Sequence, residues 1–196
     1  MYKIKLTFTE PLLGAVAKKK DVYTEFITEK GKKARKDELE TIPDIEEIGT
    51  CFHMMDGKPI IYDYVIKGLF KDACSMLRRQ KGTKSAILKS HKKVIDGLVF
   101  VFPRQILINL NGNELGVLER PLRAQTAKGE RIALAKSDCA PAGSYIEFDV
   151  KVLGVVSKQL LKEWLDYGKL RGLGQWRNAS YGRFSYEIVE SITKEL

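Results

Sequence analysis

A segment of strict alternation in the last third of the chain is the feature that most limits the fold. Within residues 144–153, Ile146, Phe148, Val150 and Val152 alternate with charged or polar residues. A period of two is that of a strand with one buried face. Such a strand must pack its apolar side against another layer, so the sequence predicts packed layers of strands and helices.

A helix and a final strand follow this segment. Residues 158–167 have the spacing of an amphipathic helix, and Gly168 is placed to end it. The apolar side chains of this helix are Leu160, Leu161, Trp164 and Leu165. Phe184, Tyr186 and Ile188 then alternate as in a last strand.

The N-terminal half contains a similar unit. Residues 3–9 alternate like a strand, residues 64–79 have a helical apolar stripe, and residues 97–102 and 105–110 are strand candidates. A strand–helix–strand unit at each end predicts an α+β fold of ferredoxin-like (RRM-like) type, an antiparallel sheet with helices on one face. We expect one domain over residues 1–196, with a charged insertion at about 17–50.

Two further segments are polar. Residues 82–93 add four lysines and predict an exposed basic loop. Residues 119–131 have little periodicity, which fits a loop or a finger of two irregular strands.

Composition sets outer bounds on function. The formal net charge of +9 suits a polyanionic partner, although charge alone does not identify one. No apolar run approaches the roughly 20 residues of a membrane span, and the N-terminus has no signal-peptide core, so we expect a cytoplasmic protein without membrane contact. Cys51, Cys74 and Cys139 are far apart, and we expect neither a metal site nor a cofactor.

Residues 171–184, between the predicted helix and the last strand, are rich in glycine and arginine and contain no acid. Their glycines are Gly172, Gly174 and Gly182, and their arginines are Arg171, Arg177 and Arg183. Arginine donates to phosphate, and exposed rings stack on bases. A phosphate- or RNA-contacting loop fits this composition, and so does a surface turn whose arginines face water.

Two other groups of cations extend the candidate site. Lys67, Lys71 and Arg78 share one face of the predicted helix at 64–79, where they could follow a phosphate backbone or keep the helix soluble. Arg120 and Arg123 fall in the segment predicted as a loop or finger.

The C-terminal third resembles the RAMP superfamily of CRISPR systems, which includes RNA-coating backbone subunits and guide-RNA ribonucleases. The family signature is roughly Gly-x-Gly-x-x-Arg-x-x-Gly-aromatic-Gly-Arg-aromatic. It is matched in order by Gly172, Gly174, Arg177, Tyr181, Gly182, Arg183 and Phe184. Residues 140–148, 57–68 and 11–14 are similar to further segments of the backbone subunits.

The resemblance implies a protein that grips single-stranded or guide RNA and has other CRISPR-complex subunits as partners. The implied RNA-binding residues are Arg171, Gly172, Gly174, Gln175, Trp176, Arg177, Asn178, Tyr181, Gly182, Arg183, Lys67, Lys71, Arg78, Arg120 and Arg123. Trp176 and Tyr181 could stack on bases, or they could pack within the loop. Arg120 and Arg123 could wedge between nucleotides.

Two alternatives stay open. A metal-independent endoribonuclease needs a base and a cation, and His53 and His91 are the two histidines of the chain. Asp21, Asp44 and Asp56 lie where some backbone subunits carry a cleaving aspartate, but no motif selects one, and we name no catalytic residue. A compact adaptor or inhibitor from a phage or mobile element, which mimics a CRISPR subunit through residues 30–47, is the other alternative.

Overall fold

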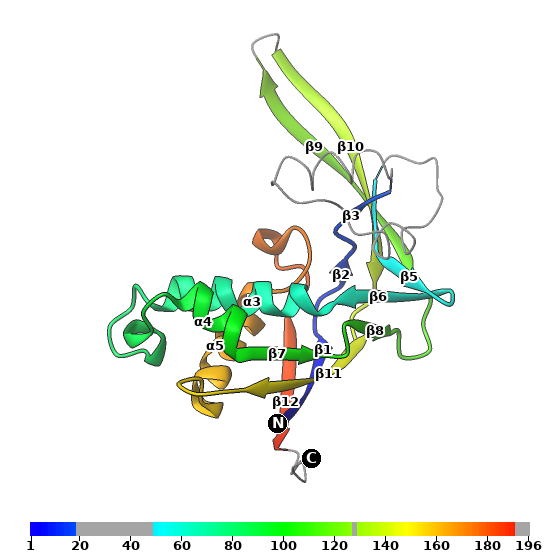
Figure 1. Ribbon diagram of the computed structural model, residues 1–196. Coiled ribbons are helices and arrows are strands. Elements are labelled where there is room, and N and C mark those ends of the chain that lie inside the picture. The colour runs from blue at the N-terminus through cyan, green and yellow to red at the C-terminus, as the bar shows by residue number, and fades with distance from the viewer. Residues whose placement is uncertain (19–48, 127–128, 191–196) are drawn as a thin grey trace.

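The computed structural model describes residues 1–18, 49–126 and 129–190. Within these ranges the larger sheet has seven strands and the smaller sheet has five (Figure 1). In the large sheet the order is β12 (Phe184–Glu190), β1 (Tyr2–Phe8), β11 (Tyr145–Val152), β8 (Gln105–Asn109), β6 (Lys58–Tyr62) and β5 (His53–Met55). Strand β7 (Val99–Phe102) also pairs with β11.

The alternating segments form the centre of this sheet. Strand β1 runs antiparallel to both β11 and β12, and Ile4 lies opposite Phe148 and Ile188. Ile4 and Phe148 are buried, whereas Lys3 is exposed. The expectation of an α+β fold with an antiparallel sheet is therefore confirmed.

Helices α3 (Asp63–Leu77) and α5 (Lys158–Arg171) share one apolar core with the sheet. Their rings meet where Phe70 and Trp164 lie 5.6 Å apart between centroids. A third helix, α4 (His91–Leu98), follows the 3-10 turn η1 (Lys84–Ile87). The prediction of a basic loop at 82–93 is wrong in this part, because its boundary at residue 93 separated His91 from Val94, Ile95 and Leu98, which together have helical spacing.

The end of α5 also differs from the prediction. Gly168 does not end the helix, which continues to Arg171 and stops at Gly172. Gly168 lies where the helix approaches its neighbours closely: a Cβ atom there would be 3.0 Å from Phe184 and 3.3 Å from Leu69. This glycine therefore allows close packing, and Gly172, with φ of 82°, forms the C-cap.

The smaller sheet is built around a long hairpin of β9 (Gly116–Thr126) and β10 (Gly129–Ala140), called here the finger. Its strands pair in regular antiparallel register from Gly116–Cys139 to Thr126–Gly129, so the predicted finger exists, with regular strands. Figure 1 shows the finger extending away from the large sheet. The finger root, residues 137–140 of β10, pairs antiparallel with β2 (Leu12–Leu13) and parallel with β4 (Thr50–Cys51). Strand β4 also pairs with β3 (Val16–Ala17).

Candidate nucleic-acid interface

The glycines of residues 172–183, called here the Gly-rich loop, are needed for contacts within the chain. A Cβ atom at Gly172 would lie 2.4 Å from the carbonyl oxygen of Tyr181, and one at Gly182 would lie 1.9 Å from that of Leu173. The amide of Leu173 donates to the carbonyl of Gly182 at 2.9 Å. Both glycines have positive φ, which side chains disfavour. The loop is therefore closed on itself by its own backbone.

Strand β2 fixes this loop to the root of the finger. The amide of Gly182 donates to the carbonyl of Pro11 at 2.9 Å, and a Cβ atom at Gly174 would lie 2.8 Å from the carbonyl oxygen of Leu13. Leu13 in turn pairs with Cys139 of β10. The Gly-rich loop and the finger root thus form one junction, although they are distant in sequence.

Two arginines of the junction meet the carboxylate of Asp72 on α3. Arg177 Nη1 donates to Asp72 Oδ2 at 2.9 Å, and Arg171 Nε lies 3.5 Å from the same oxygen. Arg171 Nη1 also donates to Asn178 Oδ1 at 2.8 Å. All three ionic side chains are about 30% exposed, so each pair is worth about 1 kcal/mol or less. Each guanidinium has five N–H donors, so these contacts orient the arginines and leave donors for a phosphate.

Arg183 is the exposed arginine of the loop. Its Nε donates to the carbonyl of Leu170 at the end of α5, at 3.0 Å. The remaining guanidinium nitrogens are the part of this side chain that a ligand can reach. Arg183 is therefore anchored at the end of α5, beside the residue that precedes Arg171.

Trp176 lies between two planar groups. The ring of Tyr181 is stacked on it at 5.1 Å between centroids and 10° between planes, and the Arg120 guanidinium carbon lies 3.7 Å from its centroid. Planar groups need about 3.5–4 Å between atoms, so both cannot occupy one face of the indole. We infer that they cover opposite faces. The structure thus brings predicted residues Arg120, Trp176 and Tyr181 together as a stack that joins finger and loop.

The guanidinium of Arg120 is incompletely satisfied. Its Nε and Nη1 atoms are buried, and neither has a hydrogen-bond partner among the residues that the structure describes. A cation–π contact contributes about 0.5–2 kcal/mol, and an unsatisfied buried donor costs about 1–3 kcal/mol. Two such donors cost about 2–6 kcal/mol together, so the contact with Trp176 does not offset the missing hydrogen bonds of Arg120.

Gln175 makes a second contact between loop and finger root. The Thr50 hydroxyl lies 3.5 Å from Gln175 Oε1 and 2.9 Å from Ser137 Oγ on β10. At the next residue of β10, Asp138 forms an ion pair with the buried Lys18 at 3.1 Å. The Ser137 and Asp138 contacts tie the finger root to its neighbours in the smaller sheet, and the Thr50–Gln175 contact links that sheet to the Gly-rich loop.

The predicted basic face of α3 is directed toward α4. Lys71 forms an ion pair with Asp96, and Lys67 donates to the carbonyl of Asp96 at 3.5 Å. Arg78 Nη1 lies 2.9 Å from His91 Nδ1. The structure therefore does not join these three cations to the loop arginines, which reach α3 at Asp72.

Some predicted residues cannot be placed. Arg123 belongs to β9 and pairs through its backbone with Ile132, but its side chain lies outside the described part of the structure. Asp21 and Asp44 lie outside the described residues, as does most of the predicted insertion. Asp56 is exposed in the turn between β5 and β6.

Both histidines are buried. An arginine can only donate, so His91 Nδ1 accepts from Arg78, and Nε2 carries the proton that it donates to Ser75 Oγ at 2.7 Å. Burial, and then the charges of Arg78 and Lys92, lower the pKa of His91. His53 packs edge-on against Tyr62 at 4.8 Å. Neither imidazole lies at the junction, so neither histidine is placed there as the base that the nuclease alternative needs.

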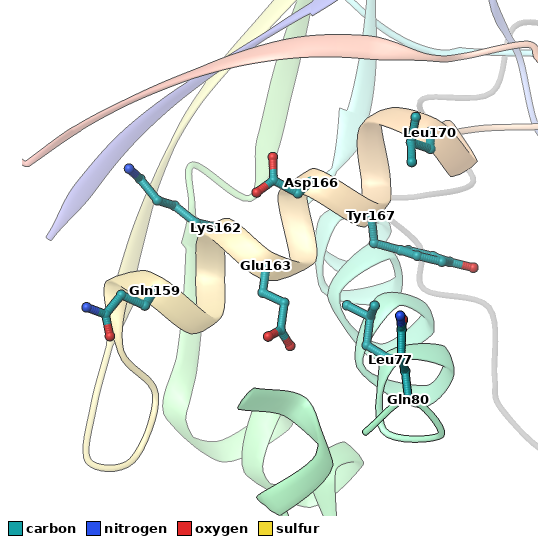
Figure 2. Close-up of a pocket in the computed structure, with 8 residues that line it drawn as sticks. All are labelled: Leu77, Gln80, Gln159, Lys162, Glu163, Asp166, Tyr167 and Leu170. Atoms are coloured by element: carbon teal, nitrogen blue, oxygen red, sulfur yellow. The ribbon is translucent and has the colours of Figure 1, made fainter. Parts of the chain in front are cut away.

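The structure also contains a groove that the sequence did not predict. It has a volume of about 550 Å³ and lies between α5 and the end of α3, where Tyr167 lies beside Leu77 and Gln80 (Figure 2). Both acids of the groove are already engaged: Glu163 accepts from the amides of Lys84 and Ser85 at 2.7 and 2.9 Å, and Asp166 accepts from the Tyr186 hydroxyl at 3.1 Å. A groove between helices depends on how they pack, so no local pattern could have revealed it.

The described residues contain no group of three or more His, Cys, Asp or Glu side chains placed to hold a metal ion. Among the helices that the structure describes, none combines the length and the apolar character required to cross a bilayer.

The chain is similar to known proteins in its three-dimensional structure. No protein-family model and no curated protein sequence matches the chain. The chain is similar to a chain in the cryo-EM structure of the type III-B Cmr-beta bound to cognate target RNA, with a TM-score of 0.55 and 14% identity over 96% of its residues. It spans 60% of the length of that chain. A chain of a type IV-B CRISPR complex matches with a TM-score of 0.47, 12% identity, and coverage of 100% of this chain and 92% of that chain.

Proposed function

We propose that this chain is a RAMP-like protein with a ferredoxin-like core that grips single-stranded or guide RNA through its Gly-rich loop. It would do so as part of a CRISPR-type ribonucleoprotein complex. The observation that carries the proposal is the convergence of Arg171, Arg177, Arg183 and Arg120 at the junction of loop and finger. Arginines held in fixed orientations recognise phosphates with little loss of entropy.

The shared fold supports the same proposal. The Cmr-beta chain of similar fold comes from a structure bound to cognate target RNA. Because this chain spans 60% of the length of that chain, the activity and the partners of the larger protein are carried over only as a proposal. No described observation favours the adaptor or inhibitor alternative, whose residues 30–47 lie outside the described ranges.

Each part of the junction has a role in this proposal. Arg177 and Arg183 bind phosphates, while Arg171 and Asn178 hold the loop in shape beside them. Gly172, Gly174 and Gly182 allow the loop to close. Lys67, Lys71 and Arg78 are secondary, because Asp96 and His91 already engage them.

The test is binding of a fluorescein-labelled single-stranded RNA, measured by anisotropy. Replacing Arg177 and Arg183 together with Ala removes two charged hydrogen-bond donors, each worth about 1.5–3 kcal/mol. The expected loss of affinity is therefore at least about 100-fold. The control is Arg79→Ala with Arg104→Ala, which removes the same charge away from the junction. Equal affinity of the two double variants would overturn the proposal.

A further inference from the structure

We propose that Arg120 and Trp176 form a phosphate-responsive joint between the finger and the Gly-rich loop. In the free protein, the guanidinium of Arg120 covers one face of the indole, as the 3.7 Å contact indicates. When single-stranded RNA binds, a phosphodiester takes Arg120 from the indole, and the uncovered face stacks on a base of the same strand. This inference rests on the proposed RNA-binding function and adds a conformational step to it.

The first support is the unfilled bonding capacity of Arg120. Its buried Nε and Nη1 atoms donate to nothing in the described ranges, and the indole offers them only a π face. A phosphodiester presents two acceptor oxygens in the geometry of a guanidinium edge. A phosphodiester therefore supplies the hydrogen-bond acceptors that Arg120 lacks in the free protein, and its negative charge strengthens these hydrogen bonds.

The second support is that the joint can open without rearranging the loop. Tyr181 stays on the other face of the indole, and both ends of the loop are held by backbone hydrogen bonds from Leu173 and Gly182. Arg120 can leave by rotating its own side chain, because it projects from a strand of the finger. Trp176 is thus kept in place for a base at small entropic cost.

The third support is position. Trp176 directly precedes Arg177, the loop arginine that Asp72 orients. A strand with one phosphate at Arg177 has its neighbouring nucleotide close to the indole and to Arg120. RNA binding at the joint therefore replaces one contact between the finger and the Gly-rich loop, while the pairing of the finger with β2 and β4 remains.

The experiment uses the fluorescence of Trp176. The chain has two tryptophans, and Trp164 is fully buried and donates to Ser85 at 3.0 Å. In the Trp164→Phe variant, Trp176 is the only tryptophan that fluoresces. If Trp164→Phe is unstable, the emission of Trp176 is obtained as the difference between the wild type and the Trp176→Phe variant. The ligands are an oligouridylate and an abasic ribose-phosphate strand of equal length, with anisotropy of labelled RNA measured in parallel.

Oligouridylate should cause a loss of Trp176 emission with the same midpoint as binding. Trp176→Leu should weaken oligouridylate binding roughly 5- to 150-fold and leave the affinity for the abasic strand unchanged. Arg120→Ala should weaken binding of both strands, whereas Arg104→Ala, which removes an arginine from the ring of Tyr62, should weaken neither.

Binding of oligouridylate with no change in Trp176 emission would overturn the joint and leave the proposed function standing. Equal losses for both strands in Trp176→Leu would also overturn it, because the indole would then have a purely structural role. Absence of RNA binding by the wild-type protein would overturn the joint and the proposed function together.

Discussion

The substitution Gly182→Ala tests whether the glycines of the loop are needed to close it. Gly182 has φ of 71°, and an added Cβ would lie 1.9 Å from the carbonyl oxygen of Leu173. Real Cβ contacts are essentially never shorter than 3.0 Å, so the two backbone segments must separate by about 1 Å.

The cost can be worked from the contacts that this separation breaks. Positive φ costs an alanine about 1–2 kcal/mol. The hydrogen bonds from Leu173 to Gly182 and from Gly182 to Pro11, both 2.9 Å, are lost at about 1 kcal/mol each. The expected loss is therefore about 3–4 kcal/mol, a large share of the roughly 5–15 kcal/mol that stabilises an ordinary domain.

Gly57→Ala is the matched control. Gly57 has φ of 73°, but nothing lies within 4 Å of its added Cβ, so only the conformational cost of about 1–2 kcal/mol applies. Urea unfolding followed by circular dichroism gives both free energies. Equal destabilisation by the two variants would refute the reasoning, because the close contact at Gly182 would then cost nothing.

Three further predictions follow from other parts of the molecule. Asp72→Asn keeps an acceptor for Arg177 but removes a negative charge beside the proposed phosphate site, so RNA affinity measured by anisotropy should rise; a fall would show that the charge of Asp72 is needed. Burial, then the hydrogen bond and charge of Asp166, raise the pKa of Tyr186 from 10.0 to about 12, so its contribution to stability is complete below pH 10 and is lost as the pH rises from 10 to 12. Urea unfolding should therefore show wild type losing more stability than Tyr186→Phe over that range, and parallel curves would contradict this. Burial, then the charge of Asp138, raise the pKa of Cys51 to about 11, so a thiol reagent at pH 8 should modify half-buried Cys139 before Cys51, and the reverse order would be inconsistent with the structure.

Much of the large sheet was predictable from residues that act locally. The alternation from Ile146 to Val152 identifies β11 because burial on one face imposes a period of two. Helix α4 was missed because the lysines on its exposed side favoured a loop that ended at residue 93, which separated His91 from Val94, Ile95 and Leu98 on the same helical face. The role of Gly168 was misjudged because its packing partners Leu69 and Phe184 are distant in sequence.

The site shows the same limit. Composition identified the loop arginines and Arg120 as candidates, but their partners depend on tertiary contacts. Asp72 lies about a hundred residues before Arg177, and Arg120 reaches Trp176 from another sheet. Local pattern gives the chemistry of a side chain and cannot tell which group it will meet.

The most direct test of RNA binding by the loop arginines is the salt dependence of RNA affinity. For single strands the slope of log K against log salt is about −0.7 for each phosphate that is neutralised. Replacing Arg177 and Arg183 with Ala should therefore make the slope shallower by about 1.4. An unchanged slope in this double variant would contradict the account, because neither arginine would then contact a phosphate.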